Sequence, residues 1–228
     1  SAEGAFDLLL KFQHIKSRES INQQMMNKSQ EIIKQYRKEV DIINDSFLRQ
    51  KDRPPVPNGQ PPAGGAIMWE KSLFDRIKRT IVRFMESEEM MASDEGRYVK
   101  DHYLRTARKM KQYEDELYEK WRVHTEACLP ALMRKTLLLK NPDTGKFEVN
   151  FAPELNVIML ESKYLEQLGF SIPELARNMA LQEHKYSMFV VGLRNMLERY
   201  HRIMSSLEPA ELDLLNDWVK QLLQTLKA

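Results

Sequence analysis

The hydrophobic positions of this chain recur every three or four residues over most of its length, the spacing of residues on one face of an α-helix. The first such stripe predicts a helix over residues 19–50, preceded by a shorter helical turn over residues 6–15. Its apolar members are Met25, Ile32, Tyr36, Ile43 and Phe47. A second stripe predicts another helix that begins at residue 66. Its members are Ile67, Trp69, Leu73, Ile77, Ile81 and Phe84.

The most regular stripe lies between residues 99 and 131 and predicts a third helix. Its members are Val99, Tyr103, Ala107, Met110, Tyr113, Leu117, Trp121, His124, Cys128 and Ala131. At about 1.5 Å of rise per residue, roughly 35 residues form a rod on the order of 50 Å long. Ser93 or Asp94 is a natural cap for the first turn of this helix. Pro130 is expected to bend the helix or to end it.

The period then changes from helical to extended. Phe147, Val149 and Phe151 alternate with polar residues, which gives the period of two expected of a half-buried strand. Residues 136–140 and 146–150 flank a turn, and we predict a small β-hairpin there. A two-stranded ribbon is marginal alone, so we expect this one to lie on the helices and to lock the third helix to the fourth.

The last third of the chain returns to helical spacing. Pro153 suits the first turn of a fourth helix that ends near residue 168, where Gly169 closes it as a C-terminal cap. Residues 171–174 begin a fifth helix with a coiled-coil-like stripe. That stripe consists of Tyr186, Phe189, Leu193, Met196, Tyr200, Ile203 and Leu207. A final amphipathic helix follows Pro209. Its stripe consists of Leu212, Leu215, Val219, Leu222 and Leu226.

Proline and glycine divide these elements. Five prolines and three glycines in residues 54–65 are expected to exclude helix there, because proline lacks the backbone donor and restricts the residue before it. The fold class expected is all-α: an elongated bundle of about five to six long helices with one small β-hairpin. The expected divisions are N-terminal helices (1–53), a linker (54–66), a helical hairpin (67–140), the β-hairpin region (141–152) and a helical bundle (153–228).

Composition removes several classes of protein. A net charge of +2 from 35 basic and 33 acidic residues describes a balanced surface and argues against nucleic-acid binding. No run approaches the roughly 20 apolar residues that cross a bilayer, so no membrane association is expected. Cys128 is the one cysteine and no leader opens the chain, which predicts a soluble protein of a reducing, intracellular setting. The first four and last two residues are interpreted as the ends of an excised fragment.

Two pairs of residues resemble parts of metal sites. His124 and Cys128 lie four residues apart on one helix face, but a zinc site needs three or four protein ligands and nothing supplies the others. Glu198 and His201 have the Glu-x-x-His spacing of di-iron helix bundles, which also need a second such pair and two further glutamates. No other histidine follows a glutamate by three residues. The sequence therefore predicts no metal site.

The candidates for catalysis are equally incomplete. Glu154 and Glu161 lie seven residues apart, hence on one helix face, without a nucleophile or an electrophile beside them. Glu183 and His184 are interpreted as part of a solvated helix face. The phosphate-binding pattern G-x-x-x-x-G-K-[ST] is absent from the sequence. We expect no catalytic residue, no cofactor and no ATP hydrolysis.

A basic cluster on the predicted third helix is the candidate binding site. It consists of Arg105, Arg108, Lys109 and Lys111. An acidic block follows at once, with Glu114, Asp115, Glu116 and Glu119. Alternating blocks of charge usually form a solvated helix face. The sharper hypothesis is a dock for a partner of complementary charge, because such patches steer association.

Four segments resemble the N-terminal stem, or tail, of dynein heavy chains, and they occur in the order expected of that family. They are PPVPNGQPPAGGAIMWEKSL (54–73), GKFEVNFAPEL (145–155), ESKYLEQLGFSIPELA (161–176) and MSSLEPAE (204–211). The form of residues 61–69 resembles ciliary and flagellar dyneins more than the cytoplasmic motor.

Two structural joints come with this resemblance. Their residues are Val149, Phe151, Pro153, Gly169 and Pro173. The first three resemble the passage from hairpin to helix in the stem, and the last two resemble the next turn. Ala152 stands where the family commonly has an aspartate, which weakens a possible helix cap.

The resemblance implies a rod-like scaffold that does no chemistry, part of a motor whose ATPase lies elsewhere. Dynein stems associate with other heavy chains and bind intermediate and light chains, and axonemal docking proteins are further partners that it implies. The cellular place it implies is the cytoplasm and cytoskeleton, in particular the axoneme of a cilium or flagellum. The residues alone leave open a free-standing helical adaptor unrelated to motors and, more distantly, an enzymatic helix bundle.

Overall fold

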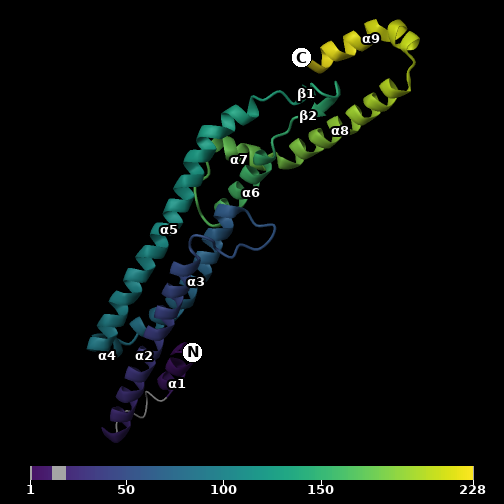
Figure 1. Ribbon diagram of the computed structural model, residues 1–228. Helices are drawn as coiled ribbons and strands as arrows, with labels where there is room; N and C mark the ends of the chain where they lie inside the picture. The colour runs from purple at the N-terminus through teal and green to yellow at the C-terminus, as the bar shows by residue number, and fades with distance from the viewer. Residues whose placement is uncertain (1, 12–18, 228) are drawn as a thin grey trace. The chain divides into compact units, whose positions relative to one another are not determined.

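The computed structural model describes residues 2–11 and 19–227. The chain forms two compact units, Ser1–Lys120 and Trp121–Ala228. Within the described residues there are nine helices and one two-stranded antiparallel sheet, which confirms the all-α prediction with one small hairpin (Figure 1). The division into five segments stays a prediction.

The first unit contains α1 (Ala2–Lys11), α2 (Glu19–Gln50), α3 (Pro62–Met85), α4 (Glu88–Ala92) and the larger part of α5 (Asp94–Met133). α2 has the bounds that its apolar stripe predicted. The helical turn expected over residues 6–15 is α1, which begins earlier; residues 12–15 lie outside the described residues. α1, α2 and α3 contact one another (Figure 1).

α3 corrects the prediction that residues 54–65 exclude helix, because it begins at Pro62. The first turn of a helix needs no proline N–H, and the fixed φ of proline suits that position. Pro61 precedes it in an extended conformation, with φ −72° and ψ 151°. Gly65 is buried in this first turn, where an added Cβ would lie 2.5 Å from Cγ1 of Val56. The linker therefore packs on the helix that follows it.

Aromatic rings fill the core of the first unit. The ring of Phe84 meets Phe6 edge-on at a centroid distance of 5.0 Å and Tyr36 at 5.2 Å. The hydroxyl of Tyr36 donates a hydrogen bond to the backbone carbonyl of Ile77 at 2.9 Å, so this buried polar atom has a partner. Farther along, the half-buried Trp69 stacks on Phe47 at 6.1 Å. These contacts join α1, α2 and α3.

The corner between α4 and α5 confirms one of the two predicted caps. Ser93 Oγ accepts a hydrogen bond from the backbone N–H of Gly96 at 3.0 Å, the geometry of a helix N-cap. Gly96 is required here because an added Cβ would lie 2.2 Å from the backbone oxygen of Met90. A short helix, α4, lies between α3 and this corner and was not predicted.

The second unit holds the end of α5 and all the later elements. These are β1 (Leu138–Lys140), β2 (Phe147–Val149), α6 (Pro153–Gln167), α7 (Glu174–Leu181), α8 (Glu183–Ser206) and α9 (Pro209–Lys227). The main core of the unit consists of Leu129, Ala152, Leu155, Ile158, Met159, Ala176, Met179 and Ala180. The hairpin and α6 lie where the sequence predicted them.

α5 departs from its predicted stripe in this unit. Pro130 lies inside the helix, which continues to Met133, so the proline does not end it at its own position. The buried face passes through Thr125 and Leu129, whereas the predicted member His124 is exposed. Near residue 129 the helix packs against α6 and α7, whose positions no repeat within α5 reveals.

The predicted fifth helix is two helices, because α7 ends at Leu181 and α8 begins at Glu183. Gln182 separates them with φ −99° and ψ 11°. No glycine or proline marks this break, so no local pattern predicts it. No member of the coiled-coil-like stripe predicted here is buried, because the buried residues of α8 are Val190 and Leu197, which lie beside the stripe.

Replacing Phe84 with alanine is expected to lower the free energy of unfolding by about 3 to 5 kcal/mol, because it removes a buried ring that contacts two others. Urea unfolding followed by circular dichroism measures the change. Val82→Ala is the matched control, since Val82 lies on the same helix with 48% of its surface exposed. A loss no larger than that of the control would show that the three rings do not hold the unit together.

Candidate partner-binding surface on α5 and the hairpin joint

Three of the four predicted basic residues lie on the outward face of α5. Arg105, Arg108 and Lys109 are exposed, and their spacing places them within one face of the helix. The opposite face carries buried residues such as Met110. Arg105 Nε donates to the backbone carbonyl of Asp101 at 3.4 Å. Within the described part of the chain, neither Arg108 nor Lys109 forms an ion pair.

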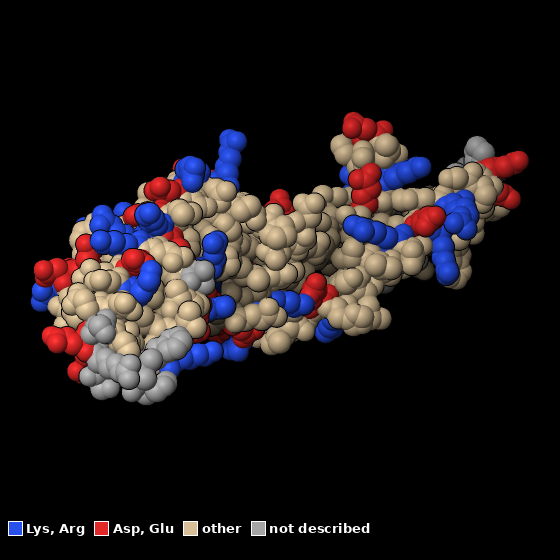
Figure 2. All heavy atoms as spheres, turned by 90° about the horizontal axis from the view of Figure 1, so that it is seen from below, with Lys and Arg blue, Asp and Glu red and all other residues tan. Residues whose placement is uncertain are grey.

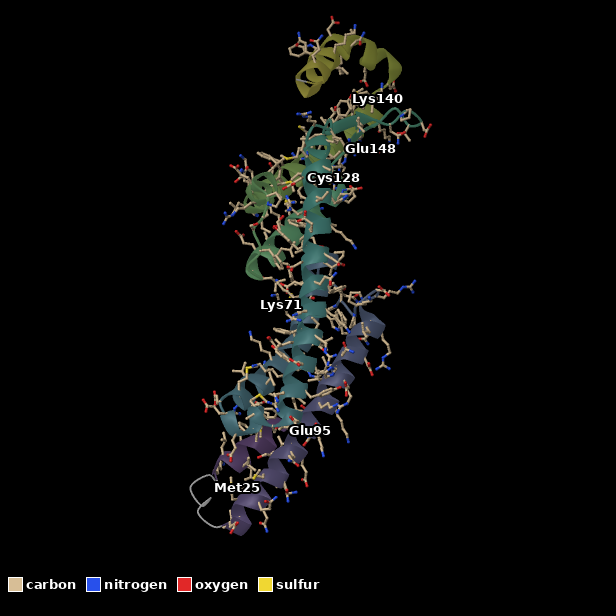
Figure 3. All side chains as sticks on the ribbon, turned by 90° about the vertical axis from the view of Figure 1, so that its left-hand side faces the viewer. Met25, Lys71, Glu95, Cys128, Lys140 and Glu148 are labelled. Atoms are coloured by element: carbon tan, nitrogen blue, oxygen red, sulfur yellow. The ribbon has the colours of Figure 1, made fainter. Side chains whose placement is uncertain are left out.

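Lys111 differs from these three, because it belongs to a network inside the first unit. Its Nζ lies 3.1 Å from Oδ1 of Asp115 and 3.4 Å from Oε1 of Glu114. Glu114 is buried on α5, and its Oε1 also lies 3.0 Å from Nζ of Lys71 on α3. Lys71 is labelled in Figure 3. The predicted cluster therefore divides: Lys111 pairs with two carboxylates of its own helix, one of which also pairs with Lys71 of α3, and the other three bases face outward.

A second carboxylate, Glu70 of α3, is buried beside this network with 2% of its surface exposed. Its Oε2 is buried and has no hydrogen-bond partner among the described residues. Burial raises the pKa of Glu70 to about 7, and repulsion from Glu114 adds to the shift, while Lys71 and Lys111 oppose it. The contact between α3 and α5 therefore includes a carboxyl group, that of Glu70, which keeps its proton to a higher pH than a free carboxyl group does.

The acidic block completes the outward face of α5. Asp115 and Glu116 are exposed, and Gln112 donates to Oε1 of Glu116 at 2.8 Å. About ten residues separate the centres of the basic and acidic blocks, which corresponds to about 15 Å along the helix axis. On the face of the molecule in Figure 2, Lys and Arg side chains likewise lie among Asp and Glu side chains.

The hairpin lies on α8. Leu138 of β1 pairs with Val149 of β2, and Val149 is half-buried, as its period predicted. The ring of Phe147 meets that of Tyr200 at 6.4 Å. The backbone N–H of Phe147 donates to Nε2 of His201 at 3.1 Å. This role of His201 was not predicted, because a contact between residues so far apart in the chain leaves no local pattern in the sequence.

The first joint connects the hairpin to α6. Phe151 packs against the core of the second unit. Ala152 is the N-cap residue of α6 and makes no side-chain cap bond; its methyl group is buried in that core instead. Pro153 occupies the first turn, as predicted. Alanine in place of the family's common aspartate therefore removes a possible helix cap and adds an apolar contact with the core.

The second joint connects α6 to α7. Gly169 has φ +89°, a conformation that side chains rarely adopt. Its N–H donates to the carbonyl of Glu166, and the N–H of Phe170 donates to that of Leu165, both at 3.0 Å. These two bonds form a Schellman motif, which confirms the predicted C-terminal cap. Pro173 is the N-cap residue of α7.

A comparison with protein families identifies the chain. The model described as "Dynein heavy chain, N-terminal region 1" matches residues 1–228. The chain belongs to this family. The family is the tail portion of dynein heavy chains and not the ATPase motor domain.

Individual relatives of this dynein tail segment are axonemal. It is 47% identical over 199 residues, or 83% of the chain, to human dynein axonemal heavy chain 10. It is 36% identical over 97% of the chain to the dynein-1-alpha heavy chain of the flagellar inner arm I1 complex of Chlamydomonas reinhardtii. It is also 29% identical over 90% of the chain to the flagellar outer-arm dynein gamma chain of that alga. The segment spans only 4% to 5% of the length of these relatives.

The residues weighed for metal binding and catalysis differ in burial in this dynein segment. His124 is exposed, while Cys128 is half-buried and its thiol lies 3.9 Å from the carbonyl oxygen of Thr125. Glu154 is exposed, whereas Glu161 is buried. Among the residues that the structure describes, no three His, Cys, Asp or Glu side chains gather as metal ligands would. In the same residues, no helix is both long and apolar enough to cross a membrane.

Glu70→Gln is expected to remove part of the pH dependence of stability. Below pH 4.5 Glu70 is protonated in the folded and the unfolded chain alike. Between pH 4.5 and about 7 only the folded chain keeps the proton, so the free energy of unfolding falls as the pH rises. Glutamine cannot lose this proton. At pH 8 the variant should therefore be more stable than the natural chain by up to about 3 kcal/mol.

Denaturant unfolding at pH 4 and pH 8 measures this difference. Glu86→Gln is the matched control, because Glu86 is exposed just beyond the end of the same helix. If the Glu70 and Glu86 variants have the same pH profile, Glu70 is ionised in the folded chain and the buried-acid interpretation is wrong.

Phe151→Ser is expected to increase tryptic cleavage at Lys140 and Lys146 severalfold. Phe151 follows the hairpin and packs against the core of the second unit, so its loss should loosen the hairpin. Limited proteolysis with mass spectrometry measures the rate. Leu139→Ser, on an exposed position of β1, is the control. Unchanged cleavage with the hairpin still folded would show that Phe151 does not anchor it.

Proposed function

We propose that this segment is a non-catalytic scaffold within the tail of an axonemal dynein heavy chain, and that the outward face of α5 docks another dynein subunit. The partners proposed are intermediate and light chains, with a second heavy chain or an axonemal docking protein as further candidates. The proposed place of action is the axoneme of a cilium or flagellum. The axonemal and flagellar names of the relatives support this part of the proposal.

The docking proposal rests on the exposure of the three outward bases. Arg105, Arg108 and Lys109 are exposed together on one helix, and the last two form no ion pair with the described residues. An exposed charge contributes little to folding stability, so folding alone gives little reason to gather three of them. Charges at the rim of an interface do affect the encounter rate and the register of a complex.

The acidic block supports the same proposal, since it follows the bases on the same face of α5. A partner helix with the opposite order of charge would be attracted in one orientation and repelled in the reverse one. This arrangement suits a tail that has to join its subunits in a fixed order. A free-standing adaptor is the less favoured alternative, because the family match extends over residues 1–228.

The proposed scaffold also depends on the two joints. The hairpin rests on α8, and the Schellman motif fixes the turn between α6 and α7. We propose that Val149, Phe151, Pro153, Gly169 and Pro173 keep these helices in place while partners pull on them. No ATP hydrolysis and no microtubule binding are proposed for this segment.

Arg105, Arg108 and Lys109 are therefore replaced together by glutamate, with Lys111 left intact because it pairs with Glu114. Capture of purified dynein intermediate and light chains is expected to weaken at least about tenfold, since like charges facing each other cost several kcal/mol. Surface plasmon resonance measures the affinity, and circular dichroism checks the helix content.

The matched control reverses three exposed bases of α3, Arg76, Lys78 and Arg79, which changes the net charge by the same amount. Weaker capture by both variants to the same degree would indicate a general charge effect. Undiminished capture by the α5 variant would place the interface on another surface. ATP turnover by the pure segment would refute the scaffold proposal as a whole.

A further inference from the structure

α8 has an apolar stripe that is covered on one side only. Phe189, Met196 and Ile203 have 57%, 44% and 59% of their surfaces exposed. Leu193 and Tyr200 lie between them along the stripe and are half-buried. Side chains of this size exposed at heptad spacing mark a surface that another element can cover.

α9 carries a matching stripe. Its apolar positions are Leu212, Leu215, Val219, Leu222 and Leu226. They are separated by three, four, three and four residues, the heptad spacing of a two-helix seam. Of the members whose side chains the structure describes, Leu215 is 38% exposed and Val219 is half-buried.

The two stripes match layer by layer when α9 is placed antiparallel to α8. The layers pair Ile203 with Leu212, Tyr200 with Leu215, Met196 with Val219, Leu193 with Leu222, and Phe189 with Leu226. In every pair the two residue numbers add to the same total. Two antiparallel helices require this, because each step forward on one is a step backward on the other. Five successive layers satisfy it without a gap.

The connection between the helices suits such a hairpin. α8 ends at Ser206 and α9 begins at Pro209, and a short connection favours antiparallel neighbours. The carboxylate of Glu211 accepts a hydrogen bond from the backbone N–H of Glu208 at 2.9 Å, as in half of a capping box. The start of α9 is therefore fixed close to the end of α8.

Charge is complementary in the same orientation. The last half of α8 carries the exposed Arg199 and Arg202 and one exposed acid, Glu198, which lies 3.5 Å from Arg202, so two bases less one acid leave a net charge of +1. The first half of α9 carries the exposed Glu211 and Asp217. An antiparallel hairpin sets these two halves beside each other. A parallel arrangement would instead set the acidic half of α9 beside the start of α8.

We propose that the apolar stripe of α8 is the docking surface for α9 of the same chain, and that the two close into an antiparallel hairpin in this register. The short connection gives α9 a high effective concentration at this surface, which favours it over the α9 of a second copy. The proposal concerns the segment's own fold and does not depend on the docking role of α5.

Cysteine pairs test the register in a chain that carries Cys128→Ser and so has no other thiol. Met196→Cys with Val219→Cys joins one layer and is expected to form a disulfide within the monomer under mild oxidation. Glu198→Cys with Asp217→Cys is the first control, at the same height but on the outer faces of both helices. Met196→Cys with Leu212→Cys is the second control, displaced by one heptad. Bridged Cα atoms lie within about 7 Å, so neither control should react.

Non-reducing electrophoresis separates the outcomes, and circular dichroism of the reduced proteins confirms that each is folded. A disulfide within the monomer in the layer pair alone supports the proposal. A disulfide between two chains in the layer pair would assign the surface to a second copy and overturn it. Absence of the bond, or equal reaction of all three pairs, would overturn it as well.

Hydrogen exchange gives a second measurement that needs no cysteine. Met196→Asp is expected to speed amide exchange in residues 212–226 by at least about tenfold, because an aspartate in the seam would be buried without a partner. Exchange in α6 should not change. Equal exchange of residues 212–226 in both proteins would show that α9 does not use this surface.

Discussion

One continuous helix has to bury side chains in two different cores. α5 contributes Val99 and Met110 to the core of the first unit and Leu129 to that of the second. α5 runs over Asp94–Met133 without a break, so its sequence supplies a buried face for each set of neighbours. The outward bases are exposed because the opposite face of the helix is the one that is buried.

Electrostatics on α5 serves two separate purposes. Lys111 and Lys71 surround the buried Glu114, which would otherwise be an uncompensated charge in an apolar contact. Glu70 meets the same difficulty differently, because burial raises its pKa to about 7 and so favours its neutral form. Arg108 and Lys109 have neither role. Basic residues that look equivalent in the sequence thus differ in whether they form an ion pair within the described chain.

Much of the fold follows from local spacing. The bounds of α2, the hairpin and the cap at Gly169 are each set by residues within one or two turns of one another. The features that escaped prediction depend on distant partners. The break at Gln182 has no glycine or proline, and Glu114, a partner of Lys111, also pairs with the distant Lys71 of α3. His201 meets the hairpin across more than fifty residues of chain. The family likeness, in contrast, was visible in short motifs alone.

The three tryptophans of the chain report on three different environments. Trp69 stacks on Phe47 in the first unit, Trp121 is buried where the second unit begins, and Trp218 is 73% exposed on α9. Indole emission shifts to longer wavelength as the ring meets water. Spectra of variants that each retain a single tryptophan would therefore separate the melting of one core from that of the other. The same spectra would follow the last helix, whose ring begins almost fully hydrated.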